Sequence, residues 1–298
     1  MKKYDAREIR ALFERGDNIA RWLRTSEGAV NNSPTAIAYS YDMQAGTYNA
    51  ELEDPSIREF RSQLGQRLAE VLEALAPISL LEAGIGEATS LRPTLAAMVS
   101  KPSQVLGFDL SMSRLMYARR HMIEAGQCNV ELFVSELARV AMPDSSIDVV
   151  LTFHALEPNR GREEEILAEL LRITARHLVL IEPSYELGSE ETRRWMDRHG
   201  YVRGLPDALR RLGFPPRVVE PWPFNQNPVN RAALIIVDKG ETQPQLPAHF
   251  ISPISGRPLV RRPDCYFCPD DGHAFPVIEG IPCLTIENSV LASKLGEF

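Results

Sequence analysis

The chain has 298 residues, of which 44% are hydrophobic and 24% are charged, and its formal net charge is -7. This composition excludes a disordered or fibrous chain, and the length predicts one core of about 200 residues with appended segments. No apolar run of about 18 residues occurs and no apolar segment follows the N-terminus, so we expect a cytosolic protein without a membrane span.

The negative net charge gives the molecule no general attraction to a phosphate backbone, so nucleic acid would need a local basic patch. Three arginine pairs are candidates for such a patch: Arg193-Arg194, Arg210-Arg211 and Arg261-Arg262. Acidic residues lie close to most of these pairs, which favours ordinary solvated faces. We therefore do not expect nucleic acid as a partner, and the sequence does not indicate an oligomeric state.

Two short amphipathic helices are predicted between Asp5 and Arg24, where apolar residues recur at helical spacing on both sides of Gly16. The stretch Asn-Asn-Ser-Pro at 31–34 breaks this pattern. Residues 37–48 are rich in tyrosine but lack clean periodicity, so a functional role explains them better than packing does. We expect residues 1–56 to form a helical cap or lid.

An alternating α/β domain is predicted over residues 57–239. Ser56 to Leu75 has the periodicity of an amphipathic helix, and short apolar runs then alternate with helix-length segments, which predicts parallel strands with crossover helices. The five expected parallel strands are Ile78–Ala83, Val105–Asp109, Val130–Val134, Ile147–Phe153 and His177–Ile181. Runs at 217–221 and 232–237 lie too close together for a crossover helix and should form an antiparallel edge hairpin. The expected fold class is α/β, with a doubly wound, Rossmann-like sheet of seven strands.

A glycine turn follows the first expected strand in the segment L-L-E-A-G-I-G-E-A-T. Glu82 ends the buried run, and Gly84 and Gly86 allow the backbone to approach a ligand while the next helix presents free N–H groups. The second strand ends in Asp109, a carboxylate about 23 residues after the turn, at the position suited to accept hydrogen bonds from two ribose hydroxyls. The alternative for Asp109 is an N-cap role for the helix after Leu110.

Two further strand ends carry candidate ligand contacts. After the third strand come Glu136 and Leu137, where a carboxylate can accept a hydrogen bond from the exocyclic amine of adenine. The fourth strand delivers Thr152, Phe153 and His154 to the carboxyl edge of the sheet, where open α/β sheets bind ligands. We therefore expect these five residues to line the pocket.

The ordered segments E-A-G-I-G-E, G-F-D, S-E-L and I-D-V-V-L-T-F-H resemble the motifs of class I S-adenosylmethionine-dependent methyltransferases over residues 80–156. The resemblance implies S-adenosylmethionine as cofactor, with Glu82, Gly84 and Gly86 around its methionine part, Asp109 at the ribose, and Glu136 with Leu137 at the adenine. The family more often has Asp where Glu136 stands. A dehydrogenase is the alternative, but the third glycine of its fingerprint is absent.

Four residues in the cap, Tyr39, Tyr41, Gln44 and Tyr48, precede the fold core at the place where related methyltransferases carry a lid. The pattern Y-D-x-Q-A-G-x-Y resembles the opening of many small-molecule members of the family. We expect Tyr41 and Tyr48 to contact the cofactor, and Tyr39 and Gln44 to contact the acceptor. Simple helix packing is the alternative.

Methyl transfer is an in-line displacement on an activated carbon, so the enzyme mainly supplies position and exclusion of water. A base is needed only for an acceptor that carries a proton, and His154 is the candidate because imidazole accepts a proton near neutral pH. A structural or positioning role for His154 is the alternative. Polar residues in the loops after the fourth and fifth strands complete the expected acceptor pocket: Glu157, Asn159, Glu182 and Tyr185.

A separate C-terminal module is expected over residues 248–298, after a polar linker at 240–247 that contains two prolines. The F-P-V-I-E-G-I-P-C-L segment and its surroundings resemble small zinc-ribbon-like activator proteins that bind methyltransferases of tRNA, rRNA and translation factors. We expect a small α+β fold whose apolar residues pack on the catalytic domain, because they are too few to stabilise about 50 residues alone.

Zinc is not expected in this module, because Ser252 and Ser255 replace the usual first pair of cysteines. Serine hydroxyls are poor zinc ligands at neutral pH. The alternative ligand set is Cys265, Cys268, His273 and Cys283.

The acidic, hydrogen-bonding acceptor pocket predicts a methyltransferase of a small polar or sugar-like metabolite. Methylation of RNA or a translation protein is the first alternative, and a non-enzymatic cofactor-binding scaffold is the second.

Overall fold

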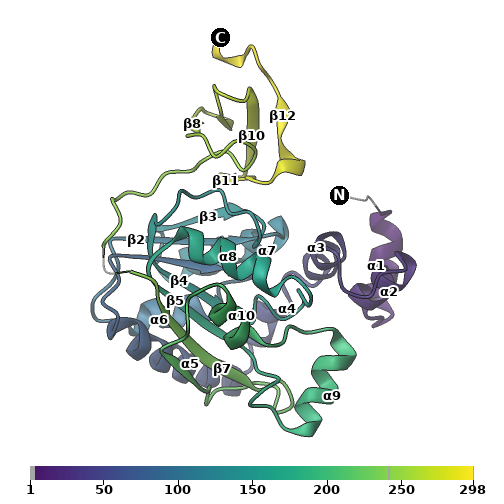
Figure 1. The fold of residues 1–298 in the computed structure, drawn as a ribbon. Coiled ribbons are helices and arrows are strands. Elements are labelled where there is room, and N and C mark those ends of the chain that lie inside the picture. The colour runs from purple at the N-terminus through teal and green to yellow at the C-terminus, as the bar shows by residue number, and fades with distance from the viewer. Residues whose placement is uncertain (1–3, 241, 298) are drawn as a thin grey trace.

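The computed structural model describes residues 4–240 and 242–297, so residue 241 of the expected linker and the ends of the chain lie outside the described residues. A seven-stranded sheet forms the centre of the molecule, in the order β3-β2-β1-β4-β5-β7-β6 (Figure 1). Its strands are β1 (Ser79–Ala83), β2 (Gln104–Asp109), β3 (Val130–Val134), β4 (Ile147–Phe153), β5 (Thr174–Pro183), β6 (Val218–Pro221) and β7 (Ala232–Asp238).

The strand directions confirm the predicted α/β class. Strands β1 to β5 are parallel to their neighbours, and β7 pairs antiparallel with both β5 and β6. The order reverses between β1 and β4, and open sheets bind ligands beside the carboxyl ends of strands at such a switch point. This topology places the ends of β1, β2 and β4 beside one another.

Helices cover both faces of the sheet, and each face has its own apolar core because side chains alternate along a strand. On one face, helices α5 (Pro55–Glu73), α6 (Leu91–Ala97) and α7 (Met112–Glu124) pack against Leu80, Val149 and Val179. On the other face, α8 (Glu163–Ile173) and α10 (Leu205–Arg211) pack against the adjacent residues of the same strands, Leu81, Val150 and Leu178, whose side chains point the opposite way. Helix α9 (Glu190–His199) follows β5.

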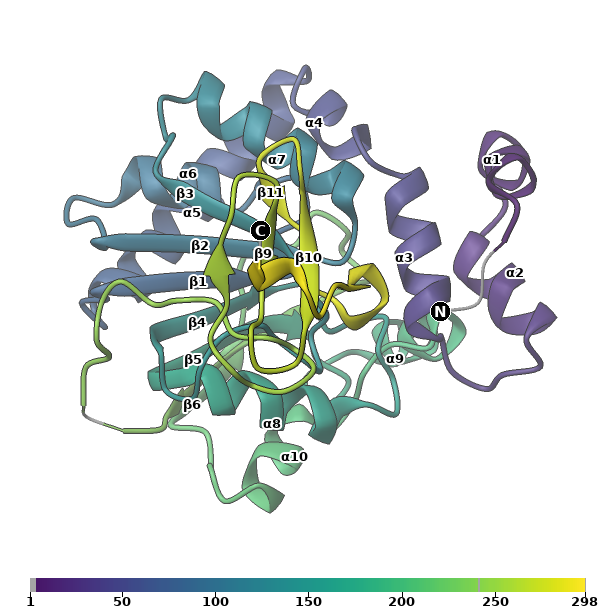
Figure 2. The same ribbon diagram turned by 90° about the horizontal axis from the view of Figure 1, so that it is seen from above.

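The N-terminal cap contains four helices, α1 (Ala6–Glu14), α2 (Ile19–Ser26), α3 (Pro34–Met43) and α4 (Thr47–Glu51). Asp5, Asn18 and Ser33 begin the first three, because each side chain accepts a hydrogen bond from a first-turn N–H. The tyrosine-rich segment is thus helical despite its irregular periodicity. Ala36 of α3 is buried in a small separate cluster with residues of the first two helices, and Tyr39 and Met43 pack against it. Figure 2 shows α1 to α3 beyond one end of the strands.

The C-terminal module is a second sheet, in the order β11-β10-β9-β8 with β12 paired to β10. Its strands are β8 (Val260–Arg261), β9 (Cys265–Phe267), β10 (His273–Ile278), β11 (Ile281–Pro282) and β12 (Val290–Leu291). Within the described part of this module, helix is limited to 3-10 turns at Ile286–Asn288 and Leu295–Glu297, so the expected α-helical component is wrong. Proline and glycine recur from 253 to 282 at intervals too short for an α-helix.

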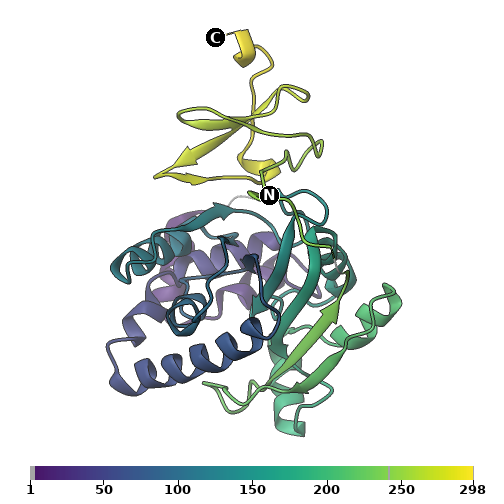
Figure 3. The same cartoon turned by 90° about the vertical axis from the view of Figure 1, so that its left-hand side faces the viewer.

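The module is attached to the open edge of the main sheet beyond β3 (Figures 1 and 3). Cys283 forms a parallel bridge with Val134, and the Leu284 N–H donates to the Val134 carbonyl at 2.9 Å. Phe250 packs on Phe133 with 4.9 Å between ring centroids. Half of the eight apolar residues expected to pack on the catalytic domain are buried, whereas Ile278 is 49% exposed. The buried four are Phe250, Phe275, Ile281 and Leu284.

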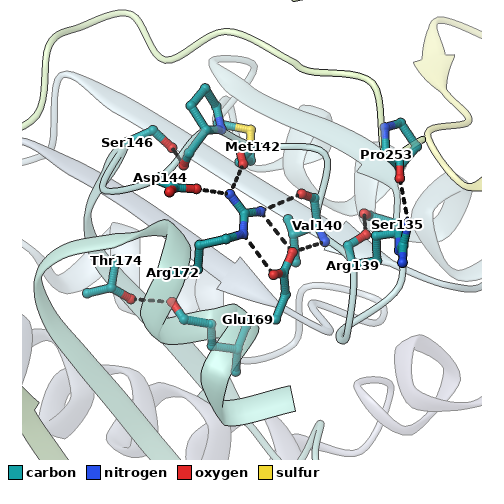
Figure 4. Close-up of polar contacts among 12 residues, drawn as sticks. Ser135, Arg139, Val140, Met142, Asp144, Ser146, Glu169, Arg172, Thr174 and Pro253 are labelled. Atoms are coloured by element: carbon teal, nitrogen blue, oxygen red, sulfur yellow. Dashed lines mark hydrogen bonds and ion pairs between the residues drawn. The ribbon is translucent and has the colours of Figure 1, made fainter. Parts of the chain in front are cut away.

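Polar contacts fix the segment that leads from β3 to β4 between the module and α8 (Figure 4). Arg172 on α8 donates to the carbonyls of Val140 and Met142, and Glu169 accepts from the Val140 N–H at 2.6 Å. Arg139 donates to the Pro253 carbonyl of the module at 3.0 Å. The loop after β3 is therefore held from both sides.

Among the described residues, no helix is long and apolar enough to cross a membrane.

Candidate cofactor and acceptor site

Two adjoining cavities lie at the carboxyl ends of β1, β2 and β4, beneath the cap. The first contains Asp109, Glu136, Leu137 and Asn159 in its wall. The second, about 510 Å³ in volume, contains Tyr48, Gly86, Phe153 and Glu157. Four residues line both cavities: Tyr41, Gly84, Arg114 and His154. The fold therefore brings most of the predicted site residues together around two adjoining cavities.

The glycine turn has the backbone that the sequence predicted. Gly84 has a φ of +72° and Gly86 a φ of +56°, which is the left-handed region that favours glycine. A Cβ on Gly84 would collide with the side chain of Ala155. The N–H of Gly86 donates to Asp109 at 3.0 Å, so the turn and the end of β2 are joined directly.

Asp109 is 8% exposed and lines the first cavity. One carboxylate oxygen accepts from the Gly86 N–H, and the other accepts from the Ser111 N–H at 2.9 Å. Ser111, not Asp109, is the N-cap of α7, because its hydroxyl accepts from the Arg114 N–H. Burial raises the pKa of Asp109, while the nearby Arg114 guanidinium opposes that rise.

Arg114 is a site residue that the sequence reasoning missed. Its guanidinium carbon lies 4.8 Å from the ring centroids of both Tyr41 and Tyr48, so a cation stacks between two cap tyrosines. Its Nε is buried without a hydrogen-bond partner among the described residues. An arginine three residues after the capping serine, facing a tyrosine-rich cap, was the available signal.

The cap is held over the cavities by polar bonds. The Asp42 carboxylate accepts from the Ser111 hydroxyl at 2.6 Å and from the N–H and hydroxyl of Ser113 at 3.1 and 3.0 Å. Glu87, just after the glycine turn, accepts from the N–H groups of Gly46 and Asn49, both at 2.9 Å. These contacts join α3 and α4 directly to the elements that carry the site.

His154 directly follows β4 and has a left-handed backbone conformation, with a φ of +53°. Such a conformation is costly for a residue with a Cβ and is found most often at functional sites. Its Nδ1 lies 3.0 Å from a Glu157 carboxylate oxygen, which also accepts from Asn230 at 3.2 Å. Burial disfavours the imidazolium, but the hydrogen bond and charge of Glu157 prevail and raise the pKa of His154. Nε2 is left without a hydrogen bond within residues 4–240 and 242–297.

Glu136 and Leu137 line the first cavity, as expected for residues beside an adenine ring. One Glu136 oxygen accepts from Arg162 at 2.7 Å, so the carboxylate is already paired with a cation. Thr152 and Glu82 are buried beneath the cavity walls and do not line them. Burial raises the pKa of Glu82 to about 8, and one of its oxygens has no partner among the described residues.

Three residues expected at the acceptor lie away from these two cavities. Both Glu182 oxygens accept backbone N–H groups, those of Ala155 and Leu156, so this carboxylate holds the loop after β4. Tyr185 stacks with Arg203 on the outer surface, 4.5 Å from its ring centroid to the guanidinium carbon. Tyr39 packs edge-on against Tyr4 inside the cap. Their polar groups are used by neighbours that sequence spacing does not show.

Gln44 and Arg61 also differ from expectation. Gln44 donates to Ser40 one turn earlier and lines a third cavity, between the cap and α9. Arg61 on α5, which the sequence reasoning missed, lines the second cavity and donates to Gln226 at 2.8 Å. Its Nε is buried and unpartnered among the described residues, which leaves a donor at the cavity wall.

Part of the chain is similar in sequence to known methyltransferases. Residues 80–177, from β1 into β5, match the family model described as a methyltransferase domain. An aklanonic acid methyltransferase of Streptomyces sp. (strain C5) is 27% identical over 115 residues, which are 39% of this chain and 50% of that protein. The chain thus spans half the length of this curated relative.

Two solved structures share the fold. Magnesium protoporphyrin IX methyltransferase from Synechocystis PCC 6803, crystallised with bound SAH, superposes with a TM-score of 0.54 at 14% identity, covering 70% of this chain and 100% of that one. A chain from the complex between a methyltransferase activator of Haloferax volcanii and a methyltransferase gives a TM-score of 0.53 at 13% identity, again covering 70% and 100%. Residues 80–177 therefore match a methyltransferase domain, and the chain shares the Rossmann-like α/β fold of these two structures.

Proposed function

We propose that this protein transfers the methyl group of S-adenosylmethionine to a small, polar or sugar-like acceptor that carries a proton at the reacting atom. The observation that carries the proposal is the His154-Glu157 pair, which stands where the two cavities meet. The domain match supports the reaction class, and the confined space under the cap favours a small acceptor over a macromolecule.

The residues around the first cavity fit an adenosine group. Asp109 offers carboxylate oxygens to ribose hydroxyls, and Leu137 with Glu136 borders the space for the adenine ring. The second cavity fits an amino acid end, because Arg61 supplies an unpartnered buried donor there. When bound, S-adenosylmethionine supplies an electrophilic methyl group on a sulfonium. Gly84 lines both cavities and so lies between the two regions.

His154 has the geometry of a general base. Its Nδ1 is held by Glu157, so Nε2 can take the proton from an acceptor O–H or N–H as that atom attacks the methyl carbon. Glu157 stabilises the imidazolium that results. Because the pKa of His154 is raised, the fraction able to accept a proton falls as the pH drops through that pKa. We expect the rate to rise with pH as the imidazolium loses its proton, over a range displaced upward from that of an ordinary histidine.

Calorimetry with S-adenosylmethionine tests the cofactor assignment. We expect Asp109→Ala to lose about 100-fold in affinity, because a partly buried carboxylate with two hydroxyl donors contributes a few kcal/mol. Unchanged affinity would overturn the role of Asp109.

A panel of small hydroxylated and amine-bearing acceptors then tests His154→Gln, which should lower kcat about 10²–10³-fold while cofactor affinity stays within about twofold. A variant with full activity would remove His154 from the chemistry.

Methylation of RNA or a translation protein is the second candidate. The β3 edge supports it, since a module resembling activators of such enzymes lies there, joined by the Val134–Cys283 bridge. The net charge of -7 opposes it, because phosphate binding relies on clustered cations. Salt-sensitive submicromolar binding to tRNA or rRNA fragments would promote this candidate over a small acceptor.

We propose a cytoplasmic location, no membrane association and no nucleic acid partner.

A further inference from the structure

Two turns in the C-terminal module repeat one design. The first is Ser252-Pro253-Ile254-Ser255-Gly256 and the second is Cys268-Pro269-Asp270-Asp271-Gly272. In each, the final glycine has a φ of +71° and donates its N–H to the carbonyl of the first residue, at 2.8 Å and 2.9 Å respectively. The two turns therefore have matching backbone geometry although they lie in different parts of the module.

The side chains at the first and fourth positions of the turns meet. One oxygen of Asp271 accepts from the Ser252 hydroxyl at 2.6 Å and from the Ser255 hydroxyl at 2.5 Å. The Ser255 hydroxyl also lies 3.7 Å from the Cys268 sulfur. Burial acts to raise the pKa of Asp271, but these hydrogen bonds prevail and lower it to about 2, so the carboxylate is ionised at neutral pH.

Two pairs of ligands on facing turns, each pair separated by two intervening residues, are the arrangement that holds tetrahedral structural zinc. Here one thiol, two hydroxyls and one carboxylate occupy the four positions, a set unsuited to zinc, which prefers thiolate and imidazole. Among the described residues, no group of three or more histidine, cysteine or acidic side chains could hold a metal. The charge of Asp271 and the two serine hydroxyls supply the link between the turns instead.

We propose that Ser252, Ser255, Cys268 and Asp271 form a metal-free staple, in which hydrogen bonds to the Asp271 carboxylate replace the metal centre of a zinc ribbon. The staple also supports the seam with the catalytic domain. Ser252 is followed by Pro253, whose carbonyl accepts from Arg139, and preceded by Ile251, whose N–H donates to the Ala141 carbonyl. These two hydrogen bonds join the first turn to the loop after β3. A change that loosens the turn should therefore also loosen that loop.

Thermal unfolding of Asp271→Ala is the first test. This variant leaves the buried Ser252 hydroxyl and the exposed Ser255 hydroxyl without their shared acceptor, and we expect its Tm to fall by about 4–8 °C. Asp270→Ala is the matched control, since Asp270 is the exposed neighbour in the same turn and should stay within about 1 °C of the parent protein. Equal Tm values for both variants would overturn the staple.

Introducing a tetrathiolate metal site at these four positions is the second test. The triple variant Ser252→Cys, Ser255→Cys and Asp271→Cys, together with the native Cys268, should bind one Co²⁺ with the absorption of a tetrahedral tetrathiolate site, and the unmodified protein should not. Metal should also raise the Tm of the triple variant. A folded triple variant that shows no cobalt absorption would contradict the geometry. Stoichiometric zinc in the unmodified protein, with a Tm that falls on chelation, would show that the staple is not metal-free.

Discussion

The N-terminal cap and the C-terminal module are both appended to the same sheet, but they are attached by different forces. The cap keeps its apolar residues in a separate cluster of Ile9, Leu12, Ile19, Leu23 and Ala36. It meets the catalytic domain largely through polar bonds to Asp42 and Glu87. The module instead contributes Phe250, Phe275 and Leu284 to the core of one sheet face, and Ile281 and Cys283 to the other.

This difference indicates different roles. Polar bonds at a part-exposed joint exchange readily for bonds to water, so an element held by them can open at small cost. Apolar side chains in a shared core cannot leave it without exposing large surfaces. We therefore expect the cap to move during cofactor entry and release, and the module to stay fixed as part of the fold.

Deleting the module gives the largest expected effect. A chain ending at Lys239 loses every module residue from both cores and leaves β3 as an uncovered edge strand. We expect this variant to be insoluble, or to unfold at least about 10 °C below the full chain. Expression, sedimentation and thermal unfolding measure the result. A soluble truncated protein of equal Tm would show that the shared core contributes nothing to stability.

A single substitution at the seam should have a smaller but still large effect. Phe250 is 6% exposed and packs on Phe133 and, edge-on, on Tyr266. We expect Phe250→Ala to cost about 3–5 kcal/mol, as for other buried phenylalanines. Denaturant unfolding measures this cost. Ile278→Ala is the matched control, because Ile278 is 49% exposed in the same module and its loss should cost about 0.5 kcal/mol or less.

The sequence predicted the features that depend on local residues, and it failed for those that depend on contacts between distant segments. The five parallel strands were predictable because each contains a short apolar run. The glycine turn and Asp109 were predictable because their backbone positions depend on local sequence. Glu182 was assigned to the acceptor because it ends β5 on the ligand side. Its partners, the N–H groups of Ala155 and Leu156, come from the loop after β4 and leave no local signal.

The same limit explains the residues that were missed. Arg61 lies in a helix with ordinary amphipathic spacing, and only the tertiary fold brings it to the cavity wall. In the module, the proline and glycine punctuation of the two turns was visible. The fourth position of the second turn was overlooked because Asp271 is not the cysteine that a search for metal ligands favours.

The smallest expected change in stability comes from breaking the joint of the cap. Asp42→Ala removes three hydrogen bonds between α3 and the start of α7, at a surface that water can reach. Because the cap has its own apolar cluster, we expect the Tm to fall by no more than about 2 °C. The closed state, however, should become less populated by about 1–2 kcal/mol, which weakens S-adenosylmethionine binding about tenfold. Calorimetry and thermal unfolding on the same sample separate these effects, with Glu14→Gln, an exposed substitution elsewhere in the cap, as control. If Asp42→Ala instead lowers the Tm as much as Phe250→Ala does and leaves cofactor affinity unchanged, the cap is as much a fixed part of the fold as the module is.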